Sequence, residues 1–459
     1  MKDYILYGAG KYVSCFLQLI LFFKDNVVAI VDGDCNKQGK NILGINVFSP
    51  NYLLESDDEI IISCMATDEI RLVLKKMNID KREVRIGNYL ARVSKHREET
   101  FKYNHNSVNY VFDLYSGAHW GGAENWNYYV AEHFKRYNSE DKVAFVADDC
   151  KELYSLKSVP IVRFDRNDDI KVIADALSLH GRICFVNSFF SLVFFAAVAA
   201  KISNPDAVKL VTVVHNDYKD LYKICDMFKD YTDLYICVSS KIRDTLVENY
   251  SLSSHKICFL PQPIEYKDTS VVRKECDEIR IGVATRLTKQ QKRVDYLPLI
   301  IEELEKKNIC YKLQIAGDGE YYDLLEDFII KQRLSGHIEL LGRIEHERMW
   351  DFWNGVDVFL SFSDFEGSSL SMLEAMSCGC VPVVTDVSGT RDYIVDGENG
   401  YILDIGDIDG ICNSIEQLYK NKESMVLMGN RSRNIVINKC NIDTYEQRLT
   451  NLLQDIVHG

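Results

Sequence analysis

Residues 363–384 read SDFEGSSLSMLEAMSCGCVPVV, and this stretch decides how the fold and the chemistry of the chain are interpreted. The apolar residues just before it, Val356–Phe362, predict a strand. The pattern breaks at Gly367 and resumes with helical spacing from Leu370 to Met376. A strand that leads through a glycine turn into a helix is the local pattern of an α/β fold.

Two glutamates lie eight residues apart in this stretch, Glu366 after the predicted strand and Glu374 inside the predicted helix. Carboxylates in these two places can converge on one ligand. Between them, near Ser368, Ser369 and Leu370, the first helical turn has free backbone N–H groups, which suit a phosphate. The stretch therefore predicts a site for a hydroxyl-rich group and a diphosphate. Taken alone, an acidic residue near a helix N-terminus is also favourable without any ligand.

The stretch resembles the donor-site signature of the retaining GT-B glycosyltransferases of family 4, two glutamates followed by a Gly-x-Pro strand entry. Here that entry is Gly379–Pro382. The resemblance implies an α/β protein with two Rossmann-like lobes. It places the donor phosphates at Gly367, Ser368, Ser369 and Leu370 and the donor ribose at Glu374. Many relatives carry an aromatic residue and a glycine where this chain has its two serines.

Two cations precede the glutamates. Arg286 and Lys292 lie six residues apart, after the strand-like Ile279–Ala284. They resemble the family's two diphosphate-binding cations. The chemistry fits, because the leaving nucleoside diphosphate gains negative charge as the glycosidic bond breaks, and fixed cations lower that barrier. Taken alone, an Arg and a Lys at these positions are also typical of a solvated surface.

Two upstream turns fall in the family's order. Gly121 and Gly122 follow the strand-like Tyr110–Tyr115, and glycines at such a turn allow a ligand to approach the backbone closely. They resemble the family's first glycine-rich loop, which faces the donor diphosphate. His215 ends the apolar stretch Val208–Val214. The carboxyl end of a parallel strand is where open α/β sheets bind ligands, and the family's histidine at this point contacts the donor sugar.

Further matches lie between the cations and the glutamates. Gly317 belongs to the turn IAGDG at residues 315–319, and Arg343 and Ile344 close the segment 339–344. In the resembled family these edges flank the nucleotide. Their backbone groups would lie near the base, so the sequence does not show which base is bound.

The first 92 residues form a unit outside the glycosyltransferase match. A strand at Tyr4–Tyr7 leads into Gly8 and Gly10, and a second strand ends at Asp32. This resembles the start of a Rossmann unit with Asp32 placed for a ribose, although Val13 replaces the third glycine. Gly8, Gly10 and Asp32 form a candidate second nucleotide site, with a structural or regulatory role slightly favoured. Asp32 and Asp34 also spell the Asp-x-Asp metal motif of a different fold, which this context argues against.

The chain thus divides into an accessory Rossmann-like unit, a polar linker, two GT-B lobes and a tail. The linker is locally basic and is interpreted as a solvated interdomain helix rather than a contact with an anionic membrane. The tail has apolar residues at helical spacing, and the resemblance implies that it packs back on the first lobe. The expected boundaries are 1–92 for the accessory unit, 93–107 for the linker, 108–275 for the acceptor lobe, 276–440 for the donor lobe and 441–459 for the tail.

Composition favours a cytoplasmic protein. A length of 459 residues suits roughly three domains, and a net charge of −14 argues against nucleic-acid binding. The 14 cysteines lack metal-binding spacing, and no secretory leader precedes them. Two apolar runs are interpreted as soluble structure: Val13–Phe23 is short of the ~20 residues that a bilayer needs, and Ile183–Ile202 splits into a strand and a helix.

Together these features predict a retaining, metal-independent hexosyltransferase that uses a nucleoside-diphosphate sugar as donor. Arg286 and Lys292 would stabilise the diphosphate, while Glu366 and His215 would orient the sugar. The acceptor would be a glycan or a lipid-linked glycan in bacterial surface polysaccharide biosynthesis, which would allow peripheral association with the inner face of the membrane. Two alternatives stay open: a noncatalytic GT-B partner or glycan-binding subunit of another transferase, and a nucleotide-sugar epimerase.

Overall fold

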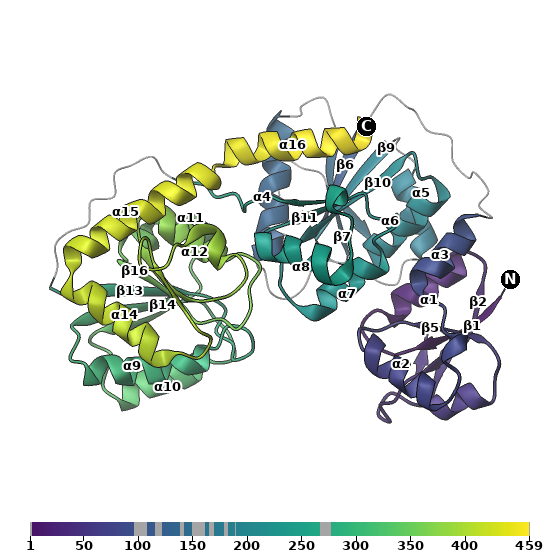
Figure 1. The fold of residues 1–459 in the computed structure, drawn as a ribbon, viewed down its shortest axis with the longest axis horizontal. Coiled ribbons are helices and arrows are strands. Elements are labelled where there is room, and N and C mark those ends of the chain that lie inside the picture. Colours follow the sequence, from purple (N-terminus) through teal and green to yellow (C-terminus); the bar gives the residue numbers. More distant parts are fainter. Residues whose placement is uncertain are drawn as a thin grey trace.

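Three predominantly parallel α/β units follow one another along the chain (Figure 1). The computed structural model describes residues 2–95, 108–114, 122–137, 142–148, 161–164, 169–178, 182–188, 190–266 and 277–458. The accessory unit lies at one end, the first lobe lies in the middle, and the second lobe lies at the other end.

The accessory unit is a five-stranded sheet with the order β3-β4-β2-β1-β5. Its central strands are parallel, and the short β3 pairs antiparallel with β4. The apolar residues of the central strands are buried, which explains why they form continuous apolar runs. Its elements are β1 Asp3–Tyr7, α1 Val13–Phe22, β2 Asn26–Val31, β3 Asn41–Ile42, β4 Ile45–Phe48, β5 Glu59–Ile62, α2 Thr67–Lys76 and α3 Ile86–Ser94.

The first lobe is a seven-stranded sheet with the order β12-β11-β10-β9-β6-β7-β8, and its pairings are parallel. The apolar run from Ile183 to Ile202 forms a strand and a buried helix, β9 and α6, as expected. The elements are β6 Val108–Leu114, α4 Gly122–Tyr137, β7 Lys142–Asp148, β8 Ile161–Phe164, α5 Ile170–Ser178, β9 Arg182–Asn187, α6 Leu192–Ser203, β10 Val208–Val214, α7 Lys219–Met227, β11 Leu234–Cys237, α8 Ser240–Tyr250 and β12 Ile257–Phe259.

The second lobe is a six-stranded sheet with the order β15-β14-β13-β16-β17-β18, again with parallel pairings. The strand predicted at Val356–Phe362 is shorter in the structure, because only its middle pairs with β13 and β17. The elements are β13 Ile279–Ala284, α9 Leu297–Lys306, β14 Tyr311–Ala316, α10 Tyr322–Lys331, β15 Ile338–Gly342, α11 His346–Asn354, β16 Val358–Ser361, α12 Leu370–Ser377, β17 Val381–Thr385, α13 Thr390–Tyr393, β18 Tyr401–Leu403, α14 Ile408–Lys420 and α15 Lys422–Lys439.

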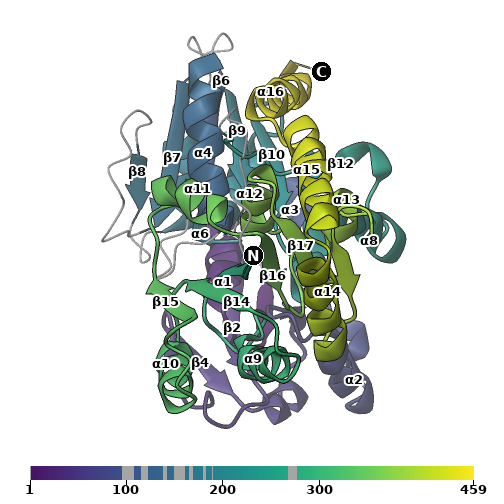
Figure 2. The ribbon, with the colours of Figure 1, turned by 90° about the vertical axis from the view of Figure 1, so that its left-hand side faces the viewer.

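The last helix returns to the first lobe. From α15 the chain continues into α16 (Ile442–His458), which packs on α4 (Figures 1 and 2). The indole Nε1 of Trp126 donates a hydrogen bond of 3.0 Å to the Tyr445 hydroxyl, and Leu449 and Leu453 are fully buried. Among the residues that the structure describes, no helix combines the length and apolar character needed to cross a membrane.

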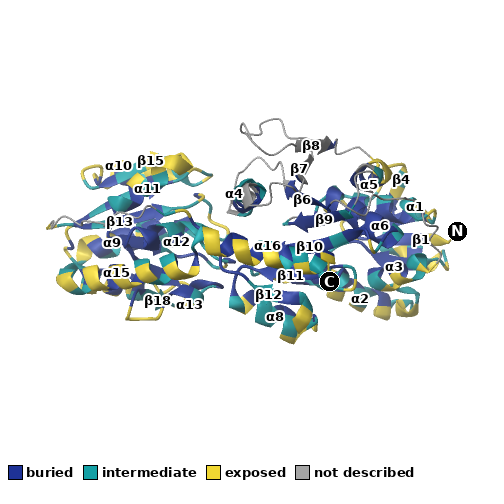
Figure 3. Ribbon diagram, turned by 90° about the horizontal axis from the view of Figure 1, so that it is seen from above, coloured by how far each residue is buried: buried dark blue, intermediate teal, exposed yellow. Residues whose placement is uncertain are grey.

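The accessory unit shares its hydrophobic core with the first lobe. Helix α1 packs against α5 and α6, and buried residues extend through both units (Figure 3). The ring of Phe16 on α1 lies 5.2 Å from that of Phe195 and 6.4 Å from that of Phe228, measured between centroids. Because α1 is buried by both units, we expect them to unfold together.

Replacing Phe16 with alanine should therefore destabilise both units at once. Removing a buried aromatic ring from a packed core costs about 3–5 kcal/mol, and Phe16 is fully buried. Urea unfolding followed by far-UV circular dichroism would show one transition shifted to lower urea. Leu72→Ala, on the exposed face of α2, is the control and should change stability by at most about 0.5 kcal/mol. A separate early transition for the accessory unit would contradict the shared core.

Candidate functional site

The two lobes meet at a glycine turn after β16. A Cβ atom on Gly367 would lie 1.8 Å from the carbonyl oxygen of His215, so only glycine fits against this end of β10. Gly389 packs against the same turn. It has φ +81°, and a Cβ there would lie 2.6 Å from the Gly367 carbonyl oxygen. Residues of both lobes therefore fix the position of the turn that carries Glu366.

Polar contacts across the lobe interface lie beside this turn. The hydroxyls of Ser239 and Ser388 share a hydrogen bond of 2.6 Å. The backbone N–H of Ser240 donates to Oδ2 of Asp392 at 3.0 Å, and the Ser240 hydroxyl also bonds this carboxylate. These contacts could not be predicted from the sequence, because single serines and aspartates outside a motif give no signal.

Lys292 and Glu366, predicted for the diphosphate and the sugar, form an ion pair with each other. The Lys292 Nζ contacts Oε1 of Glu366, and the Ser363 hydroxyl donates to the same oxygen at 2.8 Å. Glu366 is only 8 % exposed. The pair fixes a cation and a carboxylate side by side in a partly desolvated place.

The loop that carries Lys292 is locked to the loop that carries Glu366. Gln291 and Arg293 both have positive φ angles, +67° and +49°, which are strained for residues other than glycine. The Gln291 carbonyl accepts from the Asp364 N–H at 2.8 Å, and its amide donates to the Phe365 carbonyl at 3.1 Å. The Arg293 guanidinium pairs with Asp364 at 3.1 Å. These contacts hold Lys292 in place, and no local sequence pattern predicts them.

Arg286 lies exposed on the loop that follows β13. The backbone of this loop interlocks with the turn after β14, because a Cβ on Gly317 would lie 1.9 Å from the Thr285 carbonyl oxygen. The Leu287 N–H donates to the Asp318 carbonyl at 2.9 Å. The N–H of Gly317 donates to the Gly342 carbonyl at 2.7 Å, so this glycine serves the close approach of two loops.

The helix α12 begins at the predicted phosphate position. The Ser369 hydroxyl accepts from the Met372 N–H at 3.3 Å and so caps the helix. By helix geometry, the N–H groups of the first turn, beginning with Leu370, have no acceptor inside the helix. Ser368 lies between Ser369 and the turn at Gly367, which contacts the first lobe. The positive end of α12 is therefore next to the Lys292–Glu366 pair.

Glu374 lies one turn further along α12, and its partner is a residue that the sequence analysis did not select. Nε2 of His346, the first residue of α11, lies 3.4 Å from Oε1 of Glu374. Arg343 and Ile344, predicted near the base, lie on the connection between β15 and α11 and so lead directly to His346. The hydrogen bond to Glu374 raises the pKa of His346 above its usual value.

The pKa of His346 should fall when Glu374 is replaced by glutamine, because the bond to this carboxylate is the main cause of the rise. The protonated pair stabilises the fold fully below the ordinary histidine pKa of about 6.5 and stops doing so as the pH rises through the raised pKa. An NMR titration of labelled histidine would measure the change. Glu347→Gln is the matched control and should give a smaller one. An unchanged titration in Glu374→Gln would contradict the contact.

His215 is turned into the first lobe. Its Nε2 lies 3.1 Å from the Ser188 hydroxyl, which itself donates to Oδ1 of Asn127, so Nε2 carries the proton. Nδ1 lies 3.5 Å from Nε2 of Gln262, and the Trp126 ring packs edge-on at 5.2 Å. Burial lowers the pKa of His215 to about 3, so the imidazole is neutral at physiological pH. The network fixes the end of β10 against the turn at Gly367.

Two segments of the chain match known sequence families. Residues 267–435 match the sequence family described as glycosyl transferases group 1, and residues 1–85 match a family described as C2185-like, N-terminal. The first of these segments, which contains most of the second lobe, is therefore a group 1 glycosyl transferase segment. The second match covers most of the accessory unit. Both Glu366 and Glu374 lie within the group 1 segment.

Three known proteins illustrate the likeness. The UDP-N-acetylglucosamine–peptide N-acetylglucosaminyltransferase GtfA subunit of Streptococcus pneumoniae is 26 % identical over 65 % of this chain and 56 % of its own length. Its structure with UDP and GlcNAc superposes over 78 % of this chain and 100 % of that one, with a TM-score of 0.65 and 15 % identity. Anabaena HepE with UDP and glucose gives a TM-score of 0.63 at 15 % identity, over 76 % of this chain and 100 % of that one.

These structures confirm the GT-B fold that the sequence predicted. The chain spans about half the length of the curated relatives that it matches. In the first GT-B lobe, the predicted Gly121 lies outside the described residues, while Gly122 is the first residue of α4.

Outside the group 1 segment, the predicted second site has a structural network of its own. Oδ2 of Asp32 accepts from the Ala9 N–H at 2.7 Å and from Lys37 Nζ at 3.2 Å, so this carboxylate braces the loop after β1. Gly8 has φ +108°, and a Cβ there would lie 2.5 Å from Sγ of Cys64. Within the described parts of the chain, no three His, Cys, Asp or Glu side chains gather into a group that could hold a metal ion.

Proposed function

We propose that the protein transfers a sugar from a nucleoside-diphosphate donor to a hydroxyl acceptor, with retention of configuration at the anomeric carbon. The observation that carries this proposal is the placement of two carboxylates with different partners on one turn and helix. Glu366 is paired with Lys292, and Glu374 with His346. Between them lies the N-terminus of α12, where a diphosphate is favourable.

Each end of the site has a chemical role in this proposal. Lys292 and Arg286 stabilise the negative charge that the diphosphate gains as the bond to the anomeric carbon breaks. The backbone N–H groups at the start of α12 bind its oxygens. Glu374 accepts hydrogen bonds from the ribose hydroxyls, and Glu366 accepts them from the sugar. His215 acts from the first lobe by fixing the turn that carries Glu366. In this proposal the two cations provide the positive field that the leaving group needs, with no metal ion.

We propose a uridine nucleotide as the donor, because both neighbouring structures hold UDP. For the acceptor we propose a glycan or a lipid-linked glycan of a bacterial surface polysaccharide. We propose that the protein is cytoplasmic and acts at the inner face of the membrane. This step rests on family analogy. The acceptor would bind to the first lobe, where the carboxyl end of β10 lies against the turn at Gly367.

The test is donor turnover. The purified protein is incubated with UDP-glucose, UDP-N-acetylglucosamine and UDP-galactose, with and without an acceptor extract, and UDP release is measured. We expect release from one donor that increases with the extract and is lost in Glu374→Ala. Glu347→Ala, an exposed glutamate on the neighbouring helix α11, is the control. If no donor gives UDP and Glu374→Ala leaves cellular glycan unchanged, the proposal is wrong, and a noncatalytic role replaces it.

Product analysis separates transfer from epimerisation. An epimerase releases an altered nucleotide sugar without any acceptor, whereas a transferase releases UDP and a longer glycan. Chromatography of the nucleotide-sugar pool after incubation distinguishes the two. Appearance of a second nucleotide sugar in the absence of acceptor would replace the proposed reaction with epimerisation.

A further inference from the structure

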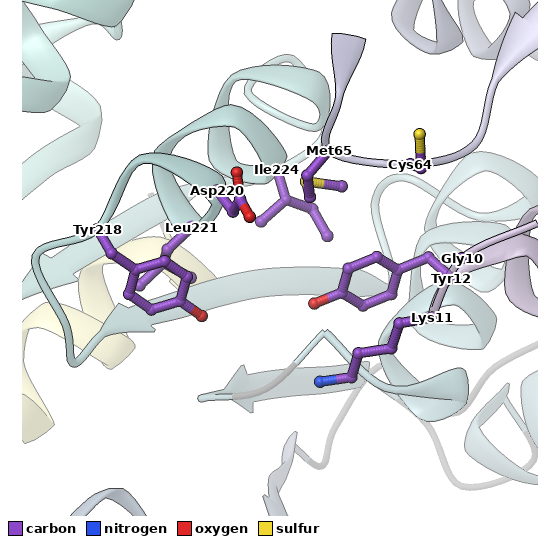
Figure 4. A pocket seen from close by; sticks show the side chains of 9 residues that line it. All are labelled: Gly10, Lys11, Tyr12, Cys64, Met65, Tyr218, Asp220, Leu221 and Ile224. Atoms are coloured by element: carbon purple, nitrogen blue, oxygen red, sulfur yellow. The ribbon is translucent and has the colours of Figure 1, made fainter. Parts of the chain in front are cut away.

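A cavity of about 350 Å³ lies between the accessory unit and the first lobe (Figure 4). On the accessory side it is lined by Gly10, Lys11 and Tyr12, which follow β1, and by Met65, which follows β5. On the other side it is lined by the segment from Tyr218 to Ile224, at the start of α7. The lining is thus made by two units that share one hydrophobic core, so its walls are held in a fixed relation.

The cavity lies at the point of the accessory sheet where ligands are expected. In the order β3-β4-β2-β1-β5, the chain leaves β1 for β2 on one side and later returns to place β5 on the other. The strand order therefore reverses between β1 and β5. Open α/β sheets bind ligands outside the carboxyl ends of the strands at such a reversal. The two accessory-unit loops that line the cavity begin at the carboxyl ends of β1 and β5.

The side chains around the cavity combine three kinds of contact. Figure 4 shows the Tyr12 and Tyr218 rings extending toward each other from opposite walls, with Lys11 beside Tyr12. Nζ of Lys11 lies 5.4 Å from the centre of the Tyr12 ring. Asp220 adds a carboxylate from α7, and Leu221 adds apolar surface. A cation suits a phosphate, and a carboxylate with two phenols suits hydroxyl groups beside an apolar ring face.

The size of the cavity limits the ligand. Small-molecule sites commonly enclose about 300–1,000 Å³, and this one is near the lower end. It suits one phosphorylated sugar better than a dinucleotide. The ribose-binding role predicted for Asp32 also does not apply to this cavity, because Asp32 is outside its lining and holds the Ala9 N–H and Lys37.

We propose that this cavity is a second ligand site that binds a phosphorylated sugar, either a free sugar phosphate or the sugar-phosphate part of a nucleotide. The phosphate lies against Lys11 and the backbone at Gly10. The sugar lies between Tyr12 and Tyr218, and its hydroxyls reach Asp220. No group of the group 1 donor site takes part in this binding.

The ligand would be sensed at the donor site through Tyr218. The ring of Tyr218 lies 6.3 Å from that of Phe365, the residue before Glu366. A ligand in the cavity that fixes Tyr218 would therefore change the affinity of the loop that carries Phe365 and Glu366 for the donor nucleotide. By linkage, the donor nucleotide would change the affinity of the cavity for its ligand by the same factor. This coupling rests on the proposed donor function, whereas the cavity site does not.

The test is isothermal titration of the full chain carrying Arg286→Ala, which weakens the donor site. The probes are glucose 1-phosphate, uridine monophosphate and inorganic phosphate. We expect saturable binding of one of the first two, weakened about tenfold or more by adding Lys11→Glu, since a lost charge-assisted contact is worth about 1.5 kcal/mol or more. Lys40→Glu makes the same charge change at an exposed lysine of the same unit and should leave binding unchanged.

The results distinguish a free sugar phosphate from a nucleotide as the ligand, and they test the cavity site separately from the donor site. Preference for glucose 1-phosphate indicates a free sugar phosphate, and preference for uridine monophosphate indicates a nucleotide. Three results would overturn the site. Inorganic phosphate could bind as tightly as glucose 1-phosphate and uridine monophosphate, neither of these two could bind, or the Lys11→Glu protein could bind them with unchanged affinity. Thermal unfolding checks that Lys11→Glu is folded. The coupling is tested by titrating UDP into the unsubstituted chain with and without the preferred ligand, and an equal affinity overturns it. Failure of donor turnover alone leaves the cavity titration unaffected.

Discussion

Replacing Lys292 with methionine should lower kcat for sugar transfer by about 10²–10³-fold, equivalent to roughly 2.7–4 kcal/mol of lost transition-state stabilisation. Two effects add in this substitution. The departing diphosphate loses a fixed cation, and Glu366, which is 8 % exposed, loses its ion-pair partner. A buried carboxylate without its partner is costly, so the Glu366 side chain would no longer be held in the position that accepts the sugar hydroxyls.

The measurement is the rate of UDP release at saturating donor and acceptor. Lys289→Met is the matched control, because Lys289 is an exposed lysine of the same loop and has no contact with Glu366 among those that the structure shows. We expect the control to retain nearly full activity. A Lys292→Met protein whose kcat falls less than about threefold would show that this cation does not face the leaving group.

Replacing Gly367 with alanine should separate donor binding from transfer. The new Cβ would lie 1.8 Å from the His215 carbonyl oxygen, so the backbone of one lobe has to move. Because this contact is between lobes, opening the interface relieves the clash without disrupting either core. A displacement on the order of 1 Å at reacting groups can cost about 10²-fold in rate. We therefore expect transfer to fall by about that factor, while the second lobe still binds UDP.

Two measurements on the same protein are needed here, kcat for transfer and the Kd for UDP. Gly336→Ala is the control, because a Cβ at Gly336 meets no atom within 4 Å and its φ is not positive. That variant should match the unsubstituted chain in both measurements. If Gly367→Ala transfers sugar at the normal rate, the lobes do not need this contact in the reacting state.

The elements with strong local patterns were predicted well. The strands at Ile279–Ala284 and Val208–Val214 have the same bounds in the structure as in the prediction. Both are mostly apolar, with Arg280 in the first and Lys209 and Thr212 in the second. Strands whose sheet is covered on both faces are rich in apolar residues, so the pattern is strong. The turn at Gly367 was also visible, since a glycine between a strand and a helix is a local signal.

The contacts that make these elements into a site were not visible. The Lys292–Glu366 pair joins residues 74 positions apart, and its geometry depends on two positive φ angles at residues other than glycine. No propensity favours those angles, because tertiary contacts to Asp364 and Phe365 impose them. His346 was missed for a similar reason. A histidine at the start of a helix has no motif, and only the packing of α11 beside α12 brings it to Glu374.

A crystal structure of this chain with UDP would show whether these residues bind the donor. We expect the diphosphate between Arg286, Lys292 and the start of α12, with the ribose hydroxyls on Glu374. Density for UDP that occupies only the cavity beside Lys11, or that leaves Lys292 and Glu374 without contact to the nucleotide, would contradict the central claim that these residues form a donor site.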